Sequence, residues 1–212
     1  MYLFTLKRLL SPRRWLLIAP IRIYLAGPEV FLKNAKEVGE KKKALCRKYG
    51  FEGVFPLDNE VDAKGKSPKE VGFCISAINE GLIKTCNFVI ANITPFRGPS
   101  ADVGTVFEMG FAHVLGKKVF AYTNTAVLFT ERTVKVLNLQ VARSRDGKLR
   151  DVHGMFIEEL DLADNLMIDG CVQASSGFLV FEEAPADQLF TYLGGLEKCL
   201  TIVQDTLKTE QK

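Results

Sequence analysis

The segment Thr94–Gly110, TPFRGPSADVGTVFEMG, contains the residues of this sequence that are best suited to chemistry. A Gly-Pro turn comes first, and Ser100 or Asp102 can cap the helix that is predicted to follow it. Glu108 lies two turns into that helix and is flanked by apolar side chains. An acid in so apolar a setting is either paired with a polar partner or functional.

The six-residue spacing turns Asp102 and Glu108 about 120° apart around the helix, with about 9 Å of rise between them. They therefore do not form an adjacent pair on one face. We expect Asp102 to overhang the end of a sheet and Glu108 to point sideways into the cleft between strands. The alternative is a helix cap at Asp102 and a solvated charge at Glu108. The physics of the sequence by itself favours this alternative, since acids are common in first turns, whereas the apolar neighbours of Glu108 argue against it.

Five short apolar segments have the composition of buried strands, and amphipathic segments separate them. Strands are expected at 21–27, 51–57, 88–93, 117–123 and 178–181, and helices at 31–49, 68–84, 102–115, 162–174 and 187–207. This alternation predicts an α/β fold, a doubly wound, flavodoxin-like parallel sheet of about five strands with helices on both faces. We expect a single domain over residues 21–208, in which the charged and weakly periodic stretch 124–161 is interpreted as an insertion.

Ligands of such sheets bind outside the carboxyl ends of the strands. Three predicted loops meet at that edge: AGPEVF, which follows the first strand at Gly27; PLDNE, which contains Asp58; and TPFRGPSAD, which contains Arg97. We therefore expect the active site to be built from these three loops.

The composition argues against several classes of function. The 212 residues carry a net charge of +3, with acids and bases interspersed, so a nucleic-acid-binding face is not expected. Five cysteines without a CxxC pair indicate buried thiols in a reducing compartment rather than a zinc or disulfide framework. Only two histidines are present, which argues against Ser-His-Asp, Cys-His and histidine-rich metal sites. No metal is expected.

The first twenty residues differ from the rest, because they carry four basic side chains and no acid and are broken by Pro12 and Pro20. Their longest apolar run is too short to cross a membrane, and no membrane partner is expected. We interpret residues 1–20 as an extension outside the fold, with an organellar transit peptide as the alternative. A cytoplasmic location is expected otherwise.

Four motifs resemble those of the nucleoside 2-deoxyribosyltransferases: IYLAGPEVF, PLDN, VIANITPFRGPSADVGTVFEMGFA and LADNLMI. The resemblance covers about residues 21–173. It implies that Glu108 is the catalytic nucleophile, that Asp102 holds hydroxyls of the deoxyribose and that Tyr24 orients the nucleophile from the first strand. Asn165 matches an asparagine that a neighbouring subunit contributes to the sugar site, so a homo-oligomer with shared sites is implied.

The reaction that the resemblance implies makes sense of these residue types. Cleavage of an N-glycosidic bond passes through an oxocarbenium-like state, which a carboxylate beneath the anomeric carbon stabilises and then captures. Two such displacements move the sugar from a deoxynucleoside to a free nucleobase and retain its configuration. Neither a metal nor an organic cofactor is required. Tyr24 can tune Glu108 by a hydrogen bond to one carboxylate oxygen, although an aromatic residue on a strand is by default a core residue.

The sequence departs from the family at the position that contacts the base. Some members carry an aspartate where the predicted helix 68–84 offers Asn79, and an amide cannot protonate the departing base. Asp58 is the candidate substitute, with a turn residue as the alternative. Arg97 is a candidate contact to the base or to a phosphate, or else a surface charge. Some compact members place their C-terminal carboxylate in the site, but this chain continues for about 40 residues beyond Gln173, and that feature is not carried over.

Two other functions remain open at this point. A deoxynucleoside 5′-monophosphate N-hydrolase would use the same carboxylate, but Asp102 would repel the phosphate, which favours the nucleoside. A non-catalytic nucleotide-binding module of the same fold would explain the three loops. It would leave Glu108 in its apolar setting unexplained.

Overall fold

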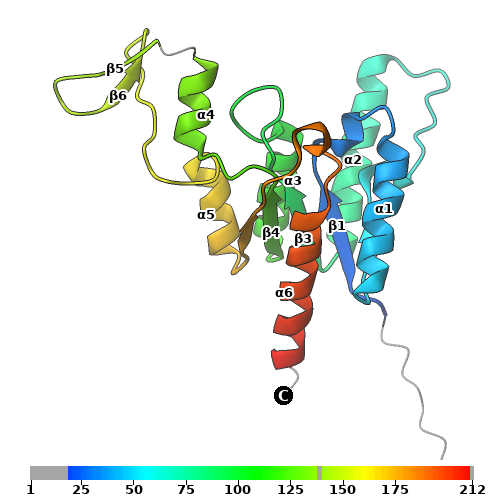
Figure 1. Ribbon diagram of the computed structural model, residues 1–212. Coiled ribbons are helices and arrows are strands. Elements are labelled where there is room, and N and C mark those ends of the chain that lie inside the picture. Colours follow the sequence, from blue (N-terminus) through cyan, green and yellow to red (C-terminus); the bar gives the residue numbers. More distant parts are fainter. Residues whose placement is uncertain (1–18, 138–139, 211–212) are drawn as a thin grey trace, which may run out of the picture.

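The computed structural model describes residues 19–137 and 140–210. Its centre is a five-stranded sheet in the order β2-β1-β3-β4-β7, in which all neighbouring strands are parallel (Figure 1). The strands are β1 (Arg22–Ala26), β2 (Glu52–Val54), β3 (Phe88–Asn92), β4 (Lys118–Thr123) and β7 (Leu179–Phe181). The strand order reverses between β1 and β3, as in flavodoxin-like sheets. The predicted fold class is confirmed.

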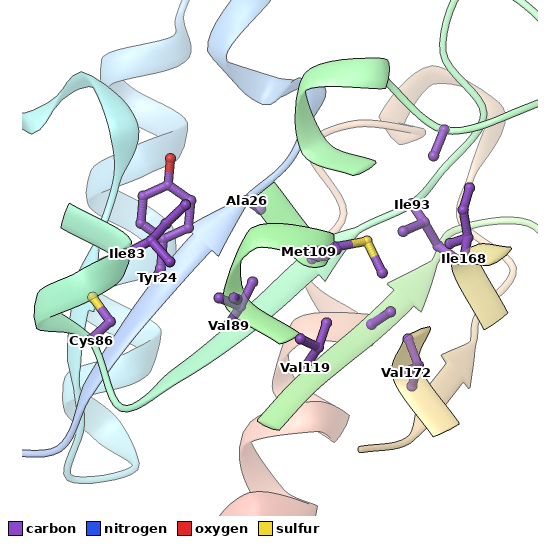
Figure 2. Close-up of a cluster of buried hydrophobic side chains, with 14 of the residues drawn as sticks. Tyr24, Ala26, Ile83, Cys86, Val89, Ile93, Met109, Val119, Ile168 and Val172 are labelled. Atoms are coloured by element: carbon purple, nitrogen blue, oxygen red, sulfur yellow. The ribbon is translucent and has the colours of Figure 1, made fainter. Parts of the chain in front are cut away.

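Helices cover both faces of this sheet. One face packs against α2 (Pro68–Thr85), α3 (Val103–Val114) and α5 (Leu166–Ala174), and the other against α1 (Ala35–Lys48) and α6 (Gly194–Glu210). Figure 2 shows the core of the first face, where Tyr24 of β1 stands beside Ile83 of α2, and Met109 of α3 lies over the strands. Because side chains alternate along a strand, Tyr24 and Ala26 belong to this core, while their neighbours Ile23 and Leu25 face α1 and α6.

Two predicted helices begin later than expected, because short 3-10 turns precede them. Pro28–Phe31 forms a 3-10 turn ahead of α1, and Ala186–Gln188 forms one ahead of α6. A third 3-10 turn, Pro56–Asp58, follows β2. Two of these turns therefore occupy loops at the carboxyl ends of β1 and β2, where the site was expected.

The helices that carry the candidate residues have well-defined starts. Ser67 and Glu70 cap α2 reciprocally, and Pro68 occupies its first position, where a missing N–H costs nothing. The side chain of Asp102 accepts a hydrogen bond from the backbone N–H of Thr105 and caps α3. These caps set the register that turns Asn79 of α2 and Glu108 of α3 toward each other.

The stretch 124–161 contains α4 (Phe129–Val136) and an antiparallel hairpin of β5 (Val141–Arg143) and β6 (Leu149–Asp151). The hairpin forms its own two-stranded sheet and projects away from the main sheet, at the upper left of Figure 1. Its identity as an insertion stays a prediction.

The predicted N-terminal extension lies outside the described residues, apart from Ala19 and Pro20. Within the described ranges, no helix combines the length and apolar character that a membrane span requires. All five cysteines are free thiols; Cys46, Cys86 and Cys199 are buried, and the other two are half-buried.

Candidate active site

Glu108 and Tyr24 are in direct contact across the face of the sheet. The Tyr24 hydroxyl, on β1, donates a hydrogen bond of 2.6 Å to Oε1 of Glu108, on α3. Asn79 of α2 donates a second, longer bond of 3.4 Å from Nδ2 to the same oxygen. No side chain within the described ranges donates to Oε2 of Glu108. One carboxylate oxygen is thus fixed, and the other is free to react.

Burial raises the pKa of Glu108 from its ordinary value of 4.5 to about 7. The hydrogen bonds from Tyr24 and Asn79 lower this pKa, and the negative charge of Asp102 raises it further. The pKa of Tyr24 is raised as well, by its own burial and by the charge of Glu108, so the phenol remains a donor. A carboxylate with a pKa near neutrality that is held by a phenol is typical of an active site.

A cavity of about 270 Å³ opens beside Glu108 at the carboxyl edge of the sheet. Its polar lining consists of Glu108, Asp102, Asn79 and Thr105, and the remaining wall is glycine and apolar side chains: Gly27, Val30, Phe31, Pro56, Leu57, Ile75 and Gly104. The three strand-end loops therefore all reach it, as expected for this fold. An apolar cavity with a few convergent polar groups suits a small organic ligand.

Asp102 both caps α3 and lines the cavity. Its Oδ2 accepts hydrogen bonds from the backbone N–H of Thr105 at 2.9 Å and from the Thr105 hydroxyl at 3.1 Å. For Asp102 the two interpretations that the sequence left open are thus compatible, because one oxygen caps the helix and the residue still lines the cavity beside Glu108. Asp102 is the N-cap residue of α3 and has an extended rather than a helical backbone conformation. It nevertheless lines the same cavity as Glu108.

A family model described as nucleoside 2-deoxyribosyltransferase matches residues 23–167, more than half of this chain. The chain belongs to the nucleoside 2-deoxyribosyltransferase family. The matched range runs from β1 to the first turn of α5, and so contains Tyr24, Glu108 and Asn165.

The chain is also similar to solved structures and to one curated relative. The chain is similar to the 2-desoxiribosyltransferase from Leishmania mexicana, with 25% identity and a TM-score of 0.53 over 82% of this chain and 97% of that one. A conserved protein from Enterococcus faecalis V583, with 17% identity and a TM-score of 0.50 over 87% and 99%, shares the fold. An uncharacterized protein of Schizosaccharomyces pombe is 26% identical over 170 residues, which is 76% of this chain and 81% of the relative.

Not every residue that was singled out by the family motifs reaches the cavity. Asp58 does not line it, because its carboxylate accepts the backbone N–H of Phe55 at 2.9 Å and pairs with Lys43 at 2.5 Å. Asp58 is thus a turn residue tied to α1, and its role as the acid for the leaving base stays a prediction.

Asn165 also lies away from the Glu108 cavity of its own chain. It caps α5 by accepting the backbone N–H of Met167 at 3.1 Å, and its amide donates to Glu158 at 3.1 Å. Its role in the site of a second copy stays a prediction.

Arg97 is exposed at the rim of the cavity. Its backbone is left-handed, with φ of 56°, and its guanidinium lies 4.5 Å from the ring centre of Phe96 and 5.1 Å from that of Phe31. Phe31 and Phe96 stack on each other at 5.2 Å. Arg97 is therefore held by aromatic rings and does not line the cavity itself.

A buried polar network directly behind Gly27 was not predicted from the sequence. Glu29 and Lys42 are both fully buried and form an ion pair of 2.8 Å. Oε1 of Glu29 also accepts hydrogen bonds from Asn92 at 3.0 Å and Tyr122 at 3.1 Å. A Cβ atom at Gly27 would lie 2.0 Å from Oε2 of Glu29, so this position needs glycine.

The network holds the 3-10 turn Pro28–Phe31, which presents Val30 and Phe31 to the cavity. A signal was present in the sequence. Lys42 falls on the same stripe of the amphipathic helix as Ala35, Val38 and Cys46, all of which are buried. A lysine on an apolar stripe indicates a buried partner.

Candidate metal ligands do not cluster in the described part of the chain, where no group of three or more His, Cys, Asp or Glu residues could hold an ion.

Proposed function

We propose that this protein transfers 2-deoxyribose from a deoxynucleoside to a free nucleobase through a covalent intermediate on Glu108. The observation that carries the proposal is the Glu108 carboxylate, which Tyr24 holds by one oxygen inside a small, largely apolar cavity. Membership of a family that acts on nucleosides supports the substrate class. A nucleoside salvage role follows from this exchange chemistry.

In the first half-reaction, Oε2 of Glu108 bonds to the anomeric carbon as the carbon–nitrogen bond breaks. The electron pair of that bond leaves with the base nitrogen, which takes up a proton from solvent. A nitrogen of a second base then attacks the same carbon as the bond to Oε2 breaks, the electron pair of that bond returns to the Glu108 carboxylate, and the proton of the incoming base passes to solvent. The two inversions retain the configuration of the sugar. The low-polarity wall of the cavity leaves the carboxylate poorly solvated, which strengthens its attraction to the oxocarbenium-like state.

The other polar residues of the cavity have supporting roles in this proposal. Asp102 accepts a hydrogen bond from a sugar hydroxyl with the oxygen that does not cap α3. The carbonyl oxygen Oδ1 of Asn79 is buried and lacks a hydrogen-bond partner within the described residues. It is placed to accept a hydrogen bond from the substrate, because a buried acceptor is costly to leave unpaired. The amide of Asn79 cannot act as a general acid, so in this proposal the departing base takes its proton from solvent.

The charge of the cavity favours a nucleoside over its 5′-monophosphate. Asp102 and Glu108 are acids, and no cationic side chain is among the residues that line this cavity. A phosphate about 4 Å from a carboxylate costs about 4 kcal/mol per charge pair at an effective dielectric constant near 20. The N-hydrolase of deoxynucleoside monophosphates is therefore the second candidate.

A single assay separates these two candidates. Deoxyguanosine and its 5′-monophosphate are supplied at equal concentration, with and without free adenine, and base release and base exchange are followed. The transferase proposal expects exchange from deoxyguanosine and little turnover of the monophosphate. Asp102→Ser keeps a helix-capping residue. This variant is expected to reduce the difference in turnover between deoxyguanosine and its 5′-monophosphate. If the unmodified protein prefers the monophosphate, the transferase proposal is rejected in favour of the hydrolase.

We also propose that the active protein is a homo-oligomer in which Asn165 enters the site of a second copy. A groove of about 530 Å³ between α3 and α5 is lined by apolar side chains and His113. Exposed apolar residues surround it: Val103, Phe107, Val114, Leu166 and Met167. Apolar surface of this kind on one face favours association with another protein.

Mixing two inactive variants tests the shared site. Glu108→Ala and Asn165→Ala are each expected to lose transfer, and mixed oligomers are expected to recover part of it, because one intact site forms from two damaged copies. A monomer in sedimentation experiments, or no recovery in subunits shown to exchange, would contradict the shared site.

A further inference from the structure

Arg132 of α4 is a buried cation for which the proposed reaction has no use. Its side chain is almost fully covered, with 8% of the residue exposed. The guanidinium donates hydrogen bonds to the backbone carbonyls of Pro99 at 2.7 Å, Ala163 at 2.6 Å and Val127. It also binds Oδ2 of Asp164 at 3.3 Å. A rigid, five-donor fork is suited to hold several backbone segments at once.

Asp164 is the buried partner of this cation, with 1% of the residue exposed. Its Oδ2 accepts the backbone N–H of Ala101 at 2.9 Å. Its Oδ1 accepts the Ser100 hydroxyl and the backbone N–H of Asn165 at 2.8 Å. Three consecutive loop residues, 99 to 101, are therefore each bound by Arg132 or Asp164.

The loop that receives these contacts ends at Asp102. It follows β3 without regular secondary structure, and it contains Arg97 in a left-handed conformation. One backbone bond, from the N–H of Phe96 to the carbonyl of Ser100 at 2.9 Å, closes the loop. Residues 97–101 belong to no helix or strand, so the side-chain contacts of Arg132 and Asp164 contribute the rest of their attachment to the body of the protein. Figure 1 shows α4 directly above α5.

We propose that Arg132 and Asp164 are positioning residues, a clamp that sets the place of Asp102 in the active site. The inference rests on the proposed function, in which Asp102 binds the sugar. The Asp164 carboxylate also accepts the backbone N–H of Asn165. The Arg132–Asp164 pair therefore positions two residues: Asp102 in the site of its own chain, and Asn165, which we propose to enter the site of a second copy. The segment 124–161, which supplies Arg132, thereby acts on the chemistry without touching substrate.

The test uses three variants of the full-length protein. Arg132→Lys keeps the buried charge beside Asp164 but loses the fork, and Ser100→Ala removes one contact without leaving a buried charge unpaired. Arg143→Lys is the matched control, because Arg143 also forms a forked ion pair, with Glu159, in the same segment, but is exposed. For each variant we would measure kcat and KM for deoxyguanosine, the pH profile, and hydrogen exchange of the backbone amides of residues 100–102.

The clamp predicts a raised KM together with a lowered kcat. We expect kcat/KM to fall about tenfold or more in Arg132→Lys and severalfold in Ser100→Ala, as for residues that orient a catalytic group from behind. The pH midpoint set by Glu108 is expected to stay in place, amide exchange to become faster, and Arg143→Lys to match the unmodified protein. Partial unfolding, in contrast, would lower the apparent kcat at constant KM.

Two results would overturn the clamp. The first is unchanged KM in folded Arg132→Lys and Ser100→Ala while transfer still depends on Glu108; the proposed function would then stand and the inference would fail. The second is unchanged amide exchange at residues 100–102 in Arg132→Lys, a measurement that needs no activity at all. If the unmodified protein neither exchanges nor hydrolyses deoxynucleosides, the proposed function fails, and the exchange experiment still decides whether the clamp exists.

Discussion

The Tyr24 hydroxyl lies 2.6 Å from Oε1 of Glu108, although 84 residues separate the two along the chain. The strand β1 presents Tyr24 to the same face of the sheet on which α3 packs. In Figure 2 the ring of Tyr24 rises from β1 and its hydroxyl points away from Cys86. This contact fixes one oxygen of the proposed nucleophile and leaves the other for the sugar.

Replacement of Tyr24 by Phe is expected to move the pH dependence of transfer upward. The Tyr24 hydrogen bond lowers the pKa of Glu108, which burial has raised to about 7. Without it the pKa of Glu108 rises, and a smaller fraction is ionised at neutral pH. We expect kcat/KM at pH 7 to fall about tenfold to a hundredfold and to recover partly at higher pH. If the midpoint of the pH–rate profile does not move, Tyr24 does not set the pKa of Glu108, and the prediction is wrong.

Glu108→Gln is expected to abolish transfer and to stabilise the fold at alkaline pH. The folded-state pKa of Glu108, about 7, is above its ordinary value of 4.5. The neutral acid is thus favoured in the folded state, and the unmodified protein loses stability as the pH rises from about 4.5 through 7. The variant does not undergo this loss of stability, so its unfolding free energy at pH 8 should exceed that of the unmodified protein by about 3 kcal/mol. Urea unfolding at pH 4.5 and pH 8 checks this, and a variant less stable than the unmodified protein at pH 8 would contradict it.

Asn79→Asp tests the position at which this chain departs from its family. The new carboxylate would replace a hydrogen-bond donor to Glu108 by a negative charge, and both changes raise the pKa of Glu108. We expect the acid limb of the pH–rate profile to move upward. If the introduced carboxyl group instead serves as the acid for the leaving base, the rate at low pH increases. An unchanged pH–rate profile would mean that the side chain at position 79 does not affect the pKa of Glu108.

Lys42→Met is expected to destabilise the protein strongly. Lys42 and Glu29 are buried within 2.8 Å of each other, and removal of the cation leaves Glu29 as an uncompensated buried charge. The expected loss is about 3–5 kcal/mol of unfolding free energy. The matched control is Lys41→Met, which breaks the exposed pair with Glu37 on the same helix and should change little. Similar denaturation midpoints for the two variants would refute the structural role of the buried pair.

The sequence by itself determined the fold class and the list of reactive groups. Uniformly apolar strand segments must be covered on both faces, and the amphipathic segments between them supply the cover. All five predicted strands of the main sheet are present. Glu108 could be singled out because an acid between apolar neighbours demands a partner or a function, and Asp102 because it can cap the helix that carries Glu108.

Which of these groups meet was decided by the tertiary structure alone. Asp58 ends its strand at the expected edge, yet Lys43 of α1 draws its carboxylate away from the cavity. The alternation of side chains along β1, together with its pairing to β3, turns Tyr24 toward α3 and Glu108. Contacts of this kind join residues far apart in the chain, and local patterns of hydrophobicity and charge do not encode them. The burial that raises the pKa of Glu108 comes from the same packing, so its reactivity is a property of the folded chain.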